Sequence, residues 1–153
     1  MHGNRTKGNE SMTRVEKIQN GMRERGIDCM VVYKPENRRY LSGFTGSAGY
    51  VVVTGDDAIF ATDFRYREQV SDECSGFTLR EIDNEFTIFS LLGELKPETV
   101  GLEEDFASIS FRDTLLEELP GAEAVRAEGI IKNSRMIKDQ HEIELLSRAC
   151  AIT

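Results

Sequence analysis

Short apolar runs of strand length alternate with segments of helical periodicity along most of this 153-residue sequence. In the segment Thr13–Arg25, Val15, Ile18 and Met22 recur at the spacing of one helix face. The run Cys29-Met-Val-Val-Tyr33 follows directly, and its continuous apolar character is the pattern of a strand buried on both faces. Because strands and helices continue to alternate, the sequence predicts an α/β domain with a mixed β-sheet and helices on both faces.

A Gly-Asp pair marks a turn in the expected sheet. It separates the apolar runs Tyr50–Val53 and Ala58–Ala61, so these strands are predicted to form an antiparallel hairpin. The remaining predicted strands are Phe77–Ile82, Thr99–Leu102 and a weaker one at Ala122–Arg126. The remaining predicted helices are a single turn at Arg38–Leu41, a short polar helix ending near Val70, a helix over Glu85–Leu95, and one that Ser108 caps and that runs to about Leu119.

The charge balance restricts the partners of this chain. Lysine and arginine number 19 and aspartate and glutamate 27, which gives a formal net charge of −8. A surface of this sign repels phosphate backbones and anionic headgroups, so we expect neither nucleic-acid binding nor membrane binding. No apolar run approaches the roughly 20 residues of a membrane span, and residues 1–11 lack the apolar core of a signal peptide. We therefore expect a cytoplasmic protein in which residues 1–11 are a disordered leader or tag.

The three cysteines agree with a reducing compartment. Cys29, Cys74 and Cys150 are widely spaced and form no C-x-x-C pair, which excludes a zinc knuckle and a thioredoxin-like motif. We expect three free thiols, with Cys29 and Cys150 buried as small hydrophobic residues.

The last part of the chain differs from the rest. Residues 133–138 have the composition of a linker-like turn, and Asp139-Gln-His-Glu142 is a variant of the capping box that begins a helix. Ile143, Leu146 and Cys150 then share one face of that helix. Because an apolar helix face needs a surface to pack against, we expect a further domain after it. The predicted organisation is a leader at 1–11, one domain at 12–132, and a linker with a first helix at 133–153 that leads to a domain absent from this chain.

The sequence contains no recognisable set of catalytic groups. The two histidines are His2, in the leader, and His141, which has no second histidine or cysteine at a ligand spacing. The acids of Glu103–Asp105 offer oxygen ligands for Mg²⁺ or Ca²⁺, but capping of the backbone after a buried strand explains them more simply. We therefore expect no catalytic residue and no metal ligand in this chain.

The glycine-rich stretch at 43–49 does not have the spacing of a phosphate-binding loop. Gly43, Gly46 and Gly49 follow a G-x-x-G-x-x-G spacing, which is neither the dinucleotide fingerprint nor a P-loop. A backbone that turns sharply and approaches its neighbours closely accounts for the same glycines.

Arg65 is the candidate binding residue with the clearest chemistry. It lies between Phe64 and Tyr66 at the exit of a predicted strand, where α/β folds present functional side chains. A guanidinium at that place can hold a carboxylate through two parallel hydrogen bonds. An ion pair with Asp63 is the alternative role.

Three motifs together resemble a known family. Tyr40-Leu-Ser-Gly-Phe-Thr-Gly-Ser47, the hairpin, and Thr62-Asp-Phe-Arg-Tyr66 resemble the amino-terminal domain of Xaa-Pro aminopeptidases, Xaa-Pro dipeptidases and creatinase. Ser134-Arg-Met-Ile-Lys138 followed by Glu142-Ile-Glu-Leu-Leu is similar to the junction that leads into the catalytic domain of that family. The resemblance covers residues 12–153, and the motifs follow the order and the spacing of the family.

The resemblance implies a second domain, of the "pita-bread" type, that is absent from this chain. In the family it holds two divalent metal ions, manganese or cobalt, through two aspartates, a histidine and two glutamates, and none of these ligand motifs occurs here. The chain is therefore expected to be the non-catalytic amino-terminal domain of a metal-dependent Xaa-Pro aminopeptidase or dipeptidase. The implied partners are its own carboxy-terminal catalytic domain, a second copy in a homodimer, and a proline-containing peptide substrate.

The resemblance also implies which residues lie near the active-site entrance, often that of a neighbouring subunit. They are Phe44, Thr45, Gly46, Ser47, Arg65 and Tyr66. The family's usual D-G-R-Y reads Asp63-Phe-Arg-Tyr66 here, so Phe64 changes the backbone path before the arginine. Two alternatives stay open: the amino-terminal domain of a creatinase, and that of a metal-free pseudo-peptidase that binds proteins, as histone chaperones do.

Overall fold

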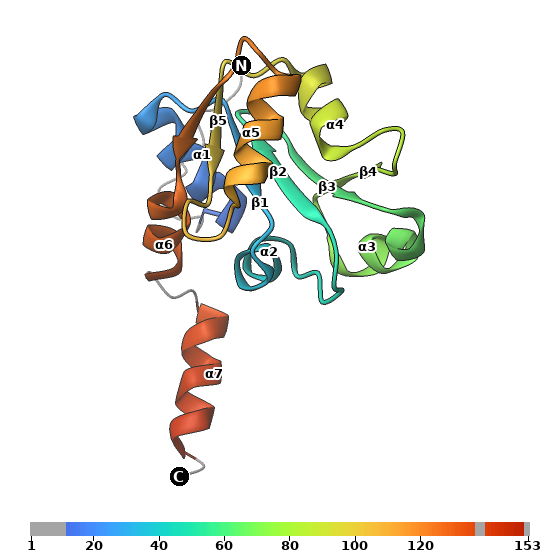
Figure 1. Cartoon of the computed structure of the whole chain (residues 1–153). Helices are drawn as coiled ribbons and strands as arrows, with labels where there is room; N and C mark the ends of the chain where they lie inside the picture. Colours follow the sequence, from blue (N-terminus) through green and yellow to red (C-terminus); the bar gives the residue numbers. More distant parts are fainter. Residues whose placement is uncertain (1–11, 137–139, 152–153) are drawn as a thin grey trace, which may run out of the picture.

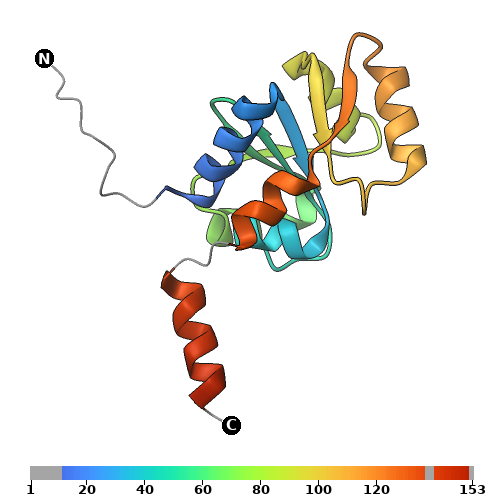
Figure 2. The ribbon, with the colours of Figure 1, turned by 90° about the vertical axis from the view of Figure 1, so that its left-hand side faces the viewer.

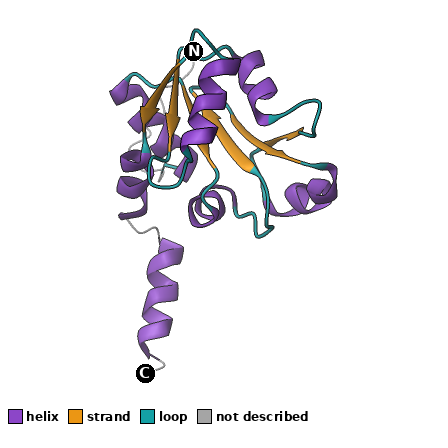
Figure 3. Cartoon of the chain, in the orientation of Figure 1, coloured by secondary structure: helices purple, strands orange, loops and turns teal. Residues whose placement is uncertain are grey.

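A six-stranded mixed β-sheet forms the centre of the computed structural model, which describes residues 12–136 and 140–151, with side chains for 12–136 and 143–150. The strands lie in the order β4-β3-β2-β1-β5-β6 (Figures 1 and 3). Strand β2 runs antiparallel to both neighbours, and all other pairs are parallel. The strands are β1 (Cys29–Val32), β2 (Tyr50–Thr54), β3 (Ala58–Thr62), β4 (Thr78–Glu81), β5 (Thr99–Leu102) and β6 (Glu123–Arg126).

Helices lie between the strands, as the alternation in the sequence predicts. The mixed sheet, the α/β class and the hairpin of β2 and β3 are confirmed, the hairpin with Val52 opposite Ile59. The described helices are α1 (Arg14–Arg25), α2 (Pro35–Ser42), the 3₁₀ turn η2 (Phe64–Tyr66), α3 (Arg67–Glu73), α4 (Ile88–Leu95), α5 (Ile109–Glu118), α6 (Glu128–Met136) and α7 (Gln140–Ala151).

Local capping determines where two helices depart from their predicted bounds. Helix α2 spans eight residues instead of a single turn, because Pro35 at its start needs no N–H partner and already has a helical φ. Helix α4 begins three residues later than predicted. The Asp83 carboxylate accepts the N–H groups of Glu85 and Phe86 and holds them in a turn, and Thr87 then caps the helix.

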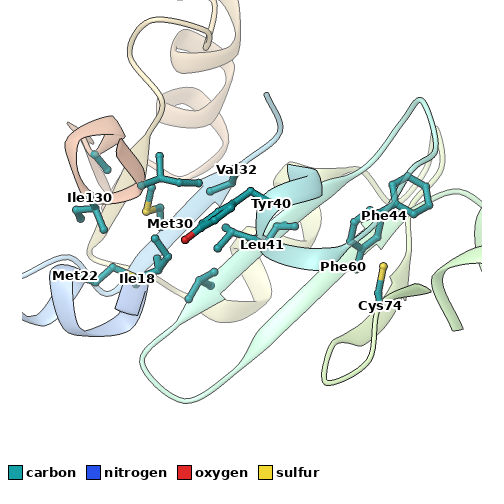
Figure 4. Packing of buried hydrophobic residues seen from close by; sticks show 14 of the residues in the cluster. Ile18, Met22, Met30, Val32, Tyr40, Leu41, Phe44, Phe60, Cys74 and Ile130 are labelled. Atoms are coloured by element: carbon teal, nitrogen blue, oxygen red, sulfur yellow. The ribbon is translucent and has the colours of Figure 1, made fainter. Parts of the chain in front are cut away.

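Two apolar clusters lie on opposite faces of the sheet. Helices α1, α2, α3 and α6 cover one face, where Ile18, Met30 and Phe60 are fully buried (Figure 4). Helices α4 and α5 cover the other, where Leu91 and Leu115 are fully buried. Figure 2 shows α1 and α6 separated from α4 and α5 by the strands. The predicted helices on both faces are therefore confirmed.

Because five strands run parallel, their carboxyl ends meet at one edge of the sheet, here called the carboxyl edge. It comprises the residues that follow β1, β3, β4, β5 and β6, together with the loop that precedes the antiparallel β2. Open α/β sheets place their functional groups at this edge. The carboxyl edge comprises residues 33–34, 43–49, 63–66, 82–83, 103–105 and 127–128.

The linker-like turn predicted at 133–138 is wrong for its first four residues, which complete helix α6. Ser134 is buried and exchanges a hydrogen bond with the Tyr40 hydroxyl at 2.9 Å, and Arg135 donates to Asn37 at 2.8 Å. These polar residues face partners within the domain, so the segment packs as a helix. The division of the chain at 132 and 133 stays a prediction, and residues 137–139 lie outside the described part.

Several other expectations concern residues at the ends of the chain. The leader at 1–11, with His2, and the side chains of His141 and Glu142 lie outside the described residues. None of the three cysteines forms a disulfide, as predicted. Cys29 is buried, as predicted, and so is Cys74, but Cys150 is exposed, so the prediction of a buried Cys150 is wrong. Among the described residues, no helix is long and apolar enough to cross a membrane.

Candidate functional site

The glycine-rich loop 43–49 and the segment 63–66 lie side by side at the carboxyl edge. The hydroxyl groups of Ser47 and Tyr66 share a hydrogen bond of 2.6 Å. The Tyr66 ring also meets the Phe44 ring edge-on, with 5.6 Å between centroids. The structure thus brings together two motifs that lie about twenty residues apart in the sequence, and both contain residues predicted for the entrance.

The predicted entrance residues differ in what they present to solvent. Phe44 is 1% exposed and packs on Phe60, with ring centroids 4.5 Å apart, so its side chain belongs to the core. Gly46 covers that ring so closely that an added Cβ atom would lie 2.3 Å from it. Thr45 and Ser47 are exposed. Within the loop, therefore, Phe44 and Gly46 hold the backbone in place and the two hydroxyl residues form the surface.

Arg38 of helix α2 fixes the backbone of this loop, a role that the sequence motifs did not reveal. It is 5% exposed, and its two terminal nitrogens donate to the Gly49 carbonyl at 3.1 Å and to the Gly46 carbonyl at 2.9 Å. Burial lowers the pKa of this guanidinium, and the nearby Glu103 carboxylate raises it. Its Nε atom has no hydrogen-bond partner among the described residues. A forked, charged donor thus fixes two carbonyl groups of one loop.

Arg65 pairs with Asp63, the alternative that the sequence left open. Its Nε and Nη2 atoms donate to the two carboxylate oxygens at 2.9 Å each, and its backbone N–H donates at 3.0 Å. The pair lowers the pKa of Asp63 and raises that of Arg65. The Arg65 side chain is nevertheless 64% exposed. Phe64, which stands where the resembling motif has glycine, is 73% exposed.

Thr45 connects the loop to the end of helix α3. Its backbone N–H and hydroxyl donate to the Glu73 carboxylate at 2.9 and 2.6 Å. Gln69 donates to the same carboxylate at 3.2 Å. The hydroxyl of Thr45 is the largest cause of a lowered pKa at Glu73. The loop is therefore attached at both ends, to α3 through Glu73 and to α2 through Arg38.

We expect Thr45→Val to raise the pKa of Glu73 toward its ordinary value, because the strongest donor to its carboxylate is removed. A carboxyl group whose pKa is lowered by folding stabilises the fold above its unfolded-state pKa, and this contribution disappears as the pH falls through the folded-state pKa. The substitution should therefore weaken the acid dependence of stability. An NMR titration of the side-chain carboxyl carbons measures the shift. The pKa of Asp83, which backbone N–H groups lower, should not move. An unchanged pKa at Glu73 would refute the assignment.

A buried carboxylate organises the other half of the carboxyl edge. Glu103 is fully buried, and one of its oxygens accepts the backbone N–H groups of Tyr33 and Lys34 at 2.9 Å each. Its other oxygen accepts the side-chain amide of Asn37 at 2.8 Å, and the Asn37 oxygen in turn accepts Arg135. This polar chain, Glu103–Asn37–Arg135, joins β1, α2, β5 and α6. It includes the arginine of the motif that resembles the family's interdomain junction.

The acids next to Glu103 also have backbone or cationic partners. Glu104 accepts the backbone N–H of Glu128 at 2.9 Å and so caps α6. Asp105 pairs with Lys34 at 3.0 Å. Burial raises the pKa of Glu128, which pairs with Lys132 at 3.2 Å. Glu103 and Glu104 accept backbone N–H groups as capping residues do, but the capped segments are distant in sequence and, contrary to the prediction, do not directly follow strand β5, and Asp105 pairs with a lysine instead. Among the described residues, no group of three or more histidine, cysteine or acidic side chains is arranged to hold a metal ion.

The geometry defines a mixed α/β domain whose polar loops gather at one edge of the sheet. The family model of the creatinase/prolidase N-terminal domain matches residues 14–137. The chain therefore belongs to the creatinase/prolidase N-terminal domain family.

Curated relatives and solved structures agree with this assignment. The chain is 33% identical to the uncharacterized peptidase YqhT of Bacillus subtilis over 91% of its own length and 40% of the relative. It is 30% identical to the Xaa-Pro dipeptidase of Pyrococcus furiosus over 91% of its length and 39% of that protein. The chain thus spans about two fifths of these relatives.

Two solved structures have the same fold. The Xaa-Pro dipeptidase from Bacillus anthracis superposes with a TM-score of 0.79 and 30% identity, over 88% of this chain and 38% of that one. The N-terminal domain of the cytoplasmic peptidase PepQ from Mycobacterium tuberculosis H37Rv superposes with a TM-score of 0.71 and 32% identity. That comparison covers 80% of this chain and 98% of the isolated domain.

Proposed function

We propose that this chain is the non-catalytic amino-terminal domain of a longer, metal-dependent Xaa-Pro aminopeptidase or dipeptidase. The relatives named as Xaa-Pro dipeptidases support this, because the chain aligns with about two fifths of their length. The proposal assigns bond cleavage to the part of the longer protein that follows this chain. It also includes a cytoplasmic location, for which the relative named as a cytoplasmic peptidase gives support.

The acids in the described part of the chain do not fit the two manganese or cobalt ions that the family implies. The buried carboxylate of Glu103 accepts three N–H donors, Glu104 accepts the N–H that begins α6, and Asp105 pairs with Lys34. A metal ion would have to displace these partners. The proposal therefore assigns both ions to the catalytic domain.

The observation that carries the proposal is the paired arrangement of the loop 43–49 and the segment 63–66. The buried Arg38 fixes the loop, and the hydrogen bond between Ser47 and Tyr66 joins the segment 63–66 to it. The exposed surface that results contains hydroxyl groups and one accessible guanidinium. Such a rigid polar rim suits the entrance of an active site on an adjoining domain or subunit, because fixed groups lose little entropy when a substrate binds. In this role Arg65 receives a carboxylate of the peptide substrate, and the rim acts in a homodimer, across the subunit interface.

We expect Arg65→Ala in the longer protein to raise KM for an Xaa-Pro dipeptide by about tenfold, with kcat nearly unchanged. The reason is the loss of a charge-assisted contact made equally in the ground state and the transition state. Arg67→Ala is the matched control, because Arg67 is likewise exposed and paired with an acid, Glu81, but lies outside the predicted entrance residues. The difference between the variants should disappear when the carboxy terminus of the peptide is amidated. Equal KM values for the Arg65 and Arg67 variants would contradict the entrance role while leaving the peptidase assignment intact.

A creatinase and a metal-free pseudo-peptidase that binds proteins remain the alternative parents. The acidic net charge of −8 suits a histone-binding factor, but it suits a cytoplasmic enzyme equally. Assays of the longer protein on creatine and on an Xaa-Pro peptide separate the three, because only a pseudo-peptidase is inactive on both.

A further inference from the structure

A hollow between helix α5 and the edge strand β6 has the features of a peptide-binding groove. Its volume is about 400 Å³, within the range that holds a ligand or several side chains. Leu102 and Ala124 form its apolar floor, and Ala107 and Ile109 flank it. Ile109 is 79% exposed, although it lies at the start of a helix that packs on the sheet.

Two cations line this hollow. Arg112 enters from α5, and Arg126 lies two residues after Ala124 on β6. Because side chains alternate along a strand, Arg126 shares the α5-facing side with Ala124, whereas Val125 packs on the opposite face. Both arginines are exposed. Neither guanidinium has a hydrogen bond or ion pair with any residue in the described part of the chain.

These unpaired guanidinium groups contrast with the arginines at the opposite edge of the sheet. There Arg80 of β4 pairs with Glu94, and Arg67 of α3 pairs with Glu81 of β4, in a chain of net charge −8. Glu104 also lines the hollow, but its carboxylate accepts the N–H that begins α6. Two guanidinium groups therefore face a single carboxylate in the lining of the hollow.

The backbone of β6 adds a third feature. Strand β6 pairs with β5 alone, so the main-chain groups on its outer side have no strand partner. An unpaired strand edge is a template for a further strand. Strand β4 is the other sheet edge, but the ion pairs of Arg67 and Arg80 neutralise the charges on it.

We infer that β6 and this groove bind an extended acidic peptide of a partner protein by strand addition. The peptide main chain pairs with the outer edge of β6. An acidic side chain meets Arg112 and Arg126, and an apolar side chain two positions away on the same face enters the floor at Leu102 and Ala124. This occupant uses all three features at once: the open edge, the apolar floor and the unpaired cations.

The test uses the whole chain and a fluorescent peptide, acetyl-Thr-Glu-Thr-Leu-Thr-Glu-Thr-amide, which places two acids and a leucine on one face. Fluorescence anisotropy should show saturable binding. Arg112→Glu combined with Arg126→Glu should weaken it at least about tenfold, since charge-assisted contacts become repulsive. Lys17→Glu combined with Arg148→Glu changes the net charge equally at other exposed or partly exposed places, and should leave binding within about twofold. Circular dichroism confirms that both double variants are folded.

Two altered peptides separate the parts of the site. Replacing both glutamates by glutamine should weaken binding about tenfold, and methylating alternate backbone nitrogens should abolish it, because strand addition needs those N–H groups. The inference is overturned if the original peptide does not bind by about 1 mM, or if both double variants bind it equally. It is also overturned if β6 pairs with a second copy of the chain. In that case the chain would be a dimer, and only the double variant at Arg112 and Arg126 would be a monomer. Loss of peptide binding in the longer protein would likewise overturn it, because the remainder of the same protein would then cover the groove.

Discussion

Replacing Glu103 with alanine is expected to lower the free energy of unfolding of the chain by about 3–5 kcal/mol. The fully buried carboxylate accepts three N–H donors, from the backbone of Tyr33 and Lys34 and from the side chain of Asn37. Each donor left buried without an acceptor costs about 1–3 kcal/mol. The truncation also leaves a cavity, which adds to the loss.

A second variant at this position tests the hydrogen-bonding explanation. Glu103→Gln keeps the volume but offers one acceptor oxygen in place of two, so an amide N–H would face the Asn37 amide. We expect it to cost about 1–2 kcal/mol, less than alanine. Glu117→Ala, an exposed acid on the outer side of α5, should change the free energy by less than about 0.5 kcal/mol. Urea denaturation of the three variants measures these differences. Equal effects at positions 103 and 117 would contradict the account of the carboxyl edge.

Arg38→Met is expected to release the loop 43–49 and to destabilise the chain by about 2 kcal/mol. Methionine fills much of the buried space, but the carbonyl groups of Gly46 and Gly49 lose their charged donor. Burial of the charged guanidinium is itself unfavourable, so its removal offsets part of the lost stability. Amide hydrogen exchange should accelerate in the loop more than in the sheet, since only the loop loses its hydrogen bonds with Arg38.

The next residue provides the matched control for this experiment. Arg39 lies on the same helix but is exposed, and Arg39→Met should leave both stability and loop exchange nearly unchanged. Arg38→Lys keeps the positive charge but lacks the planar guanidinium that reaches two carbonyl groups. Its stability and its rate of loop exchange should therefore lie between those of Arg38→Met and Arg39→Met. If loop exchange in Arg38→Met equalled that in Arg39→Met, Arg38 would have no role in holding the loop.

The sequence predicted the sheet well because its strongest signals are local. The continuous apolar run at 29–33 became a strand that is buried along its whole length. The Gly-Asp turn produced the hairpin, and Gly26 adopts the left-handed conformation that ends α1. The motifs at 40–47 and 62–66 were identified as parts of one site, and the hydrogen bond between Ser47 and Tyr66 joins them.

The features that the sequence missed depend on contacts between distant residues. Asn133-Ser-Arg135 has the composition of a linker, but Tyr40 and Asn37, the partners of Ser134 and Arg135, lie 94 and 98 positions away. The partners of Glu103 lie about 70 positions earlier, so no local pattern reveals the buried carboxylate. Phe44 was predicted among the entrance residues, yet the tight passage of Gly46 over its ring encloses the side chain in the core.

The most direct test of the central claim compares this chain with the longer protein in one peptidase assay. Both are incubated with an Xaa-Pro peptide and added Mn²⁺, and release of the amino-terminal residue is measured. The account predicts hydrolysis by the longer protein alone. Metal-dependent cleavage of the peptide by this chain alone would contradict it, because a catalytic site would then have to exist among residues assigned here to caps, ion pairs and the entrance rim.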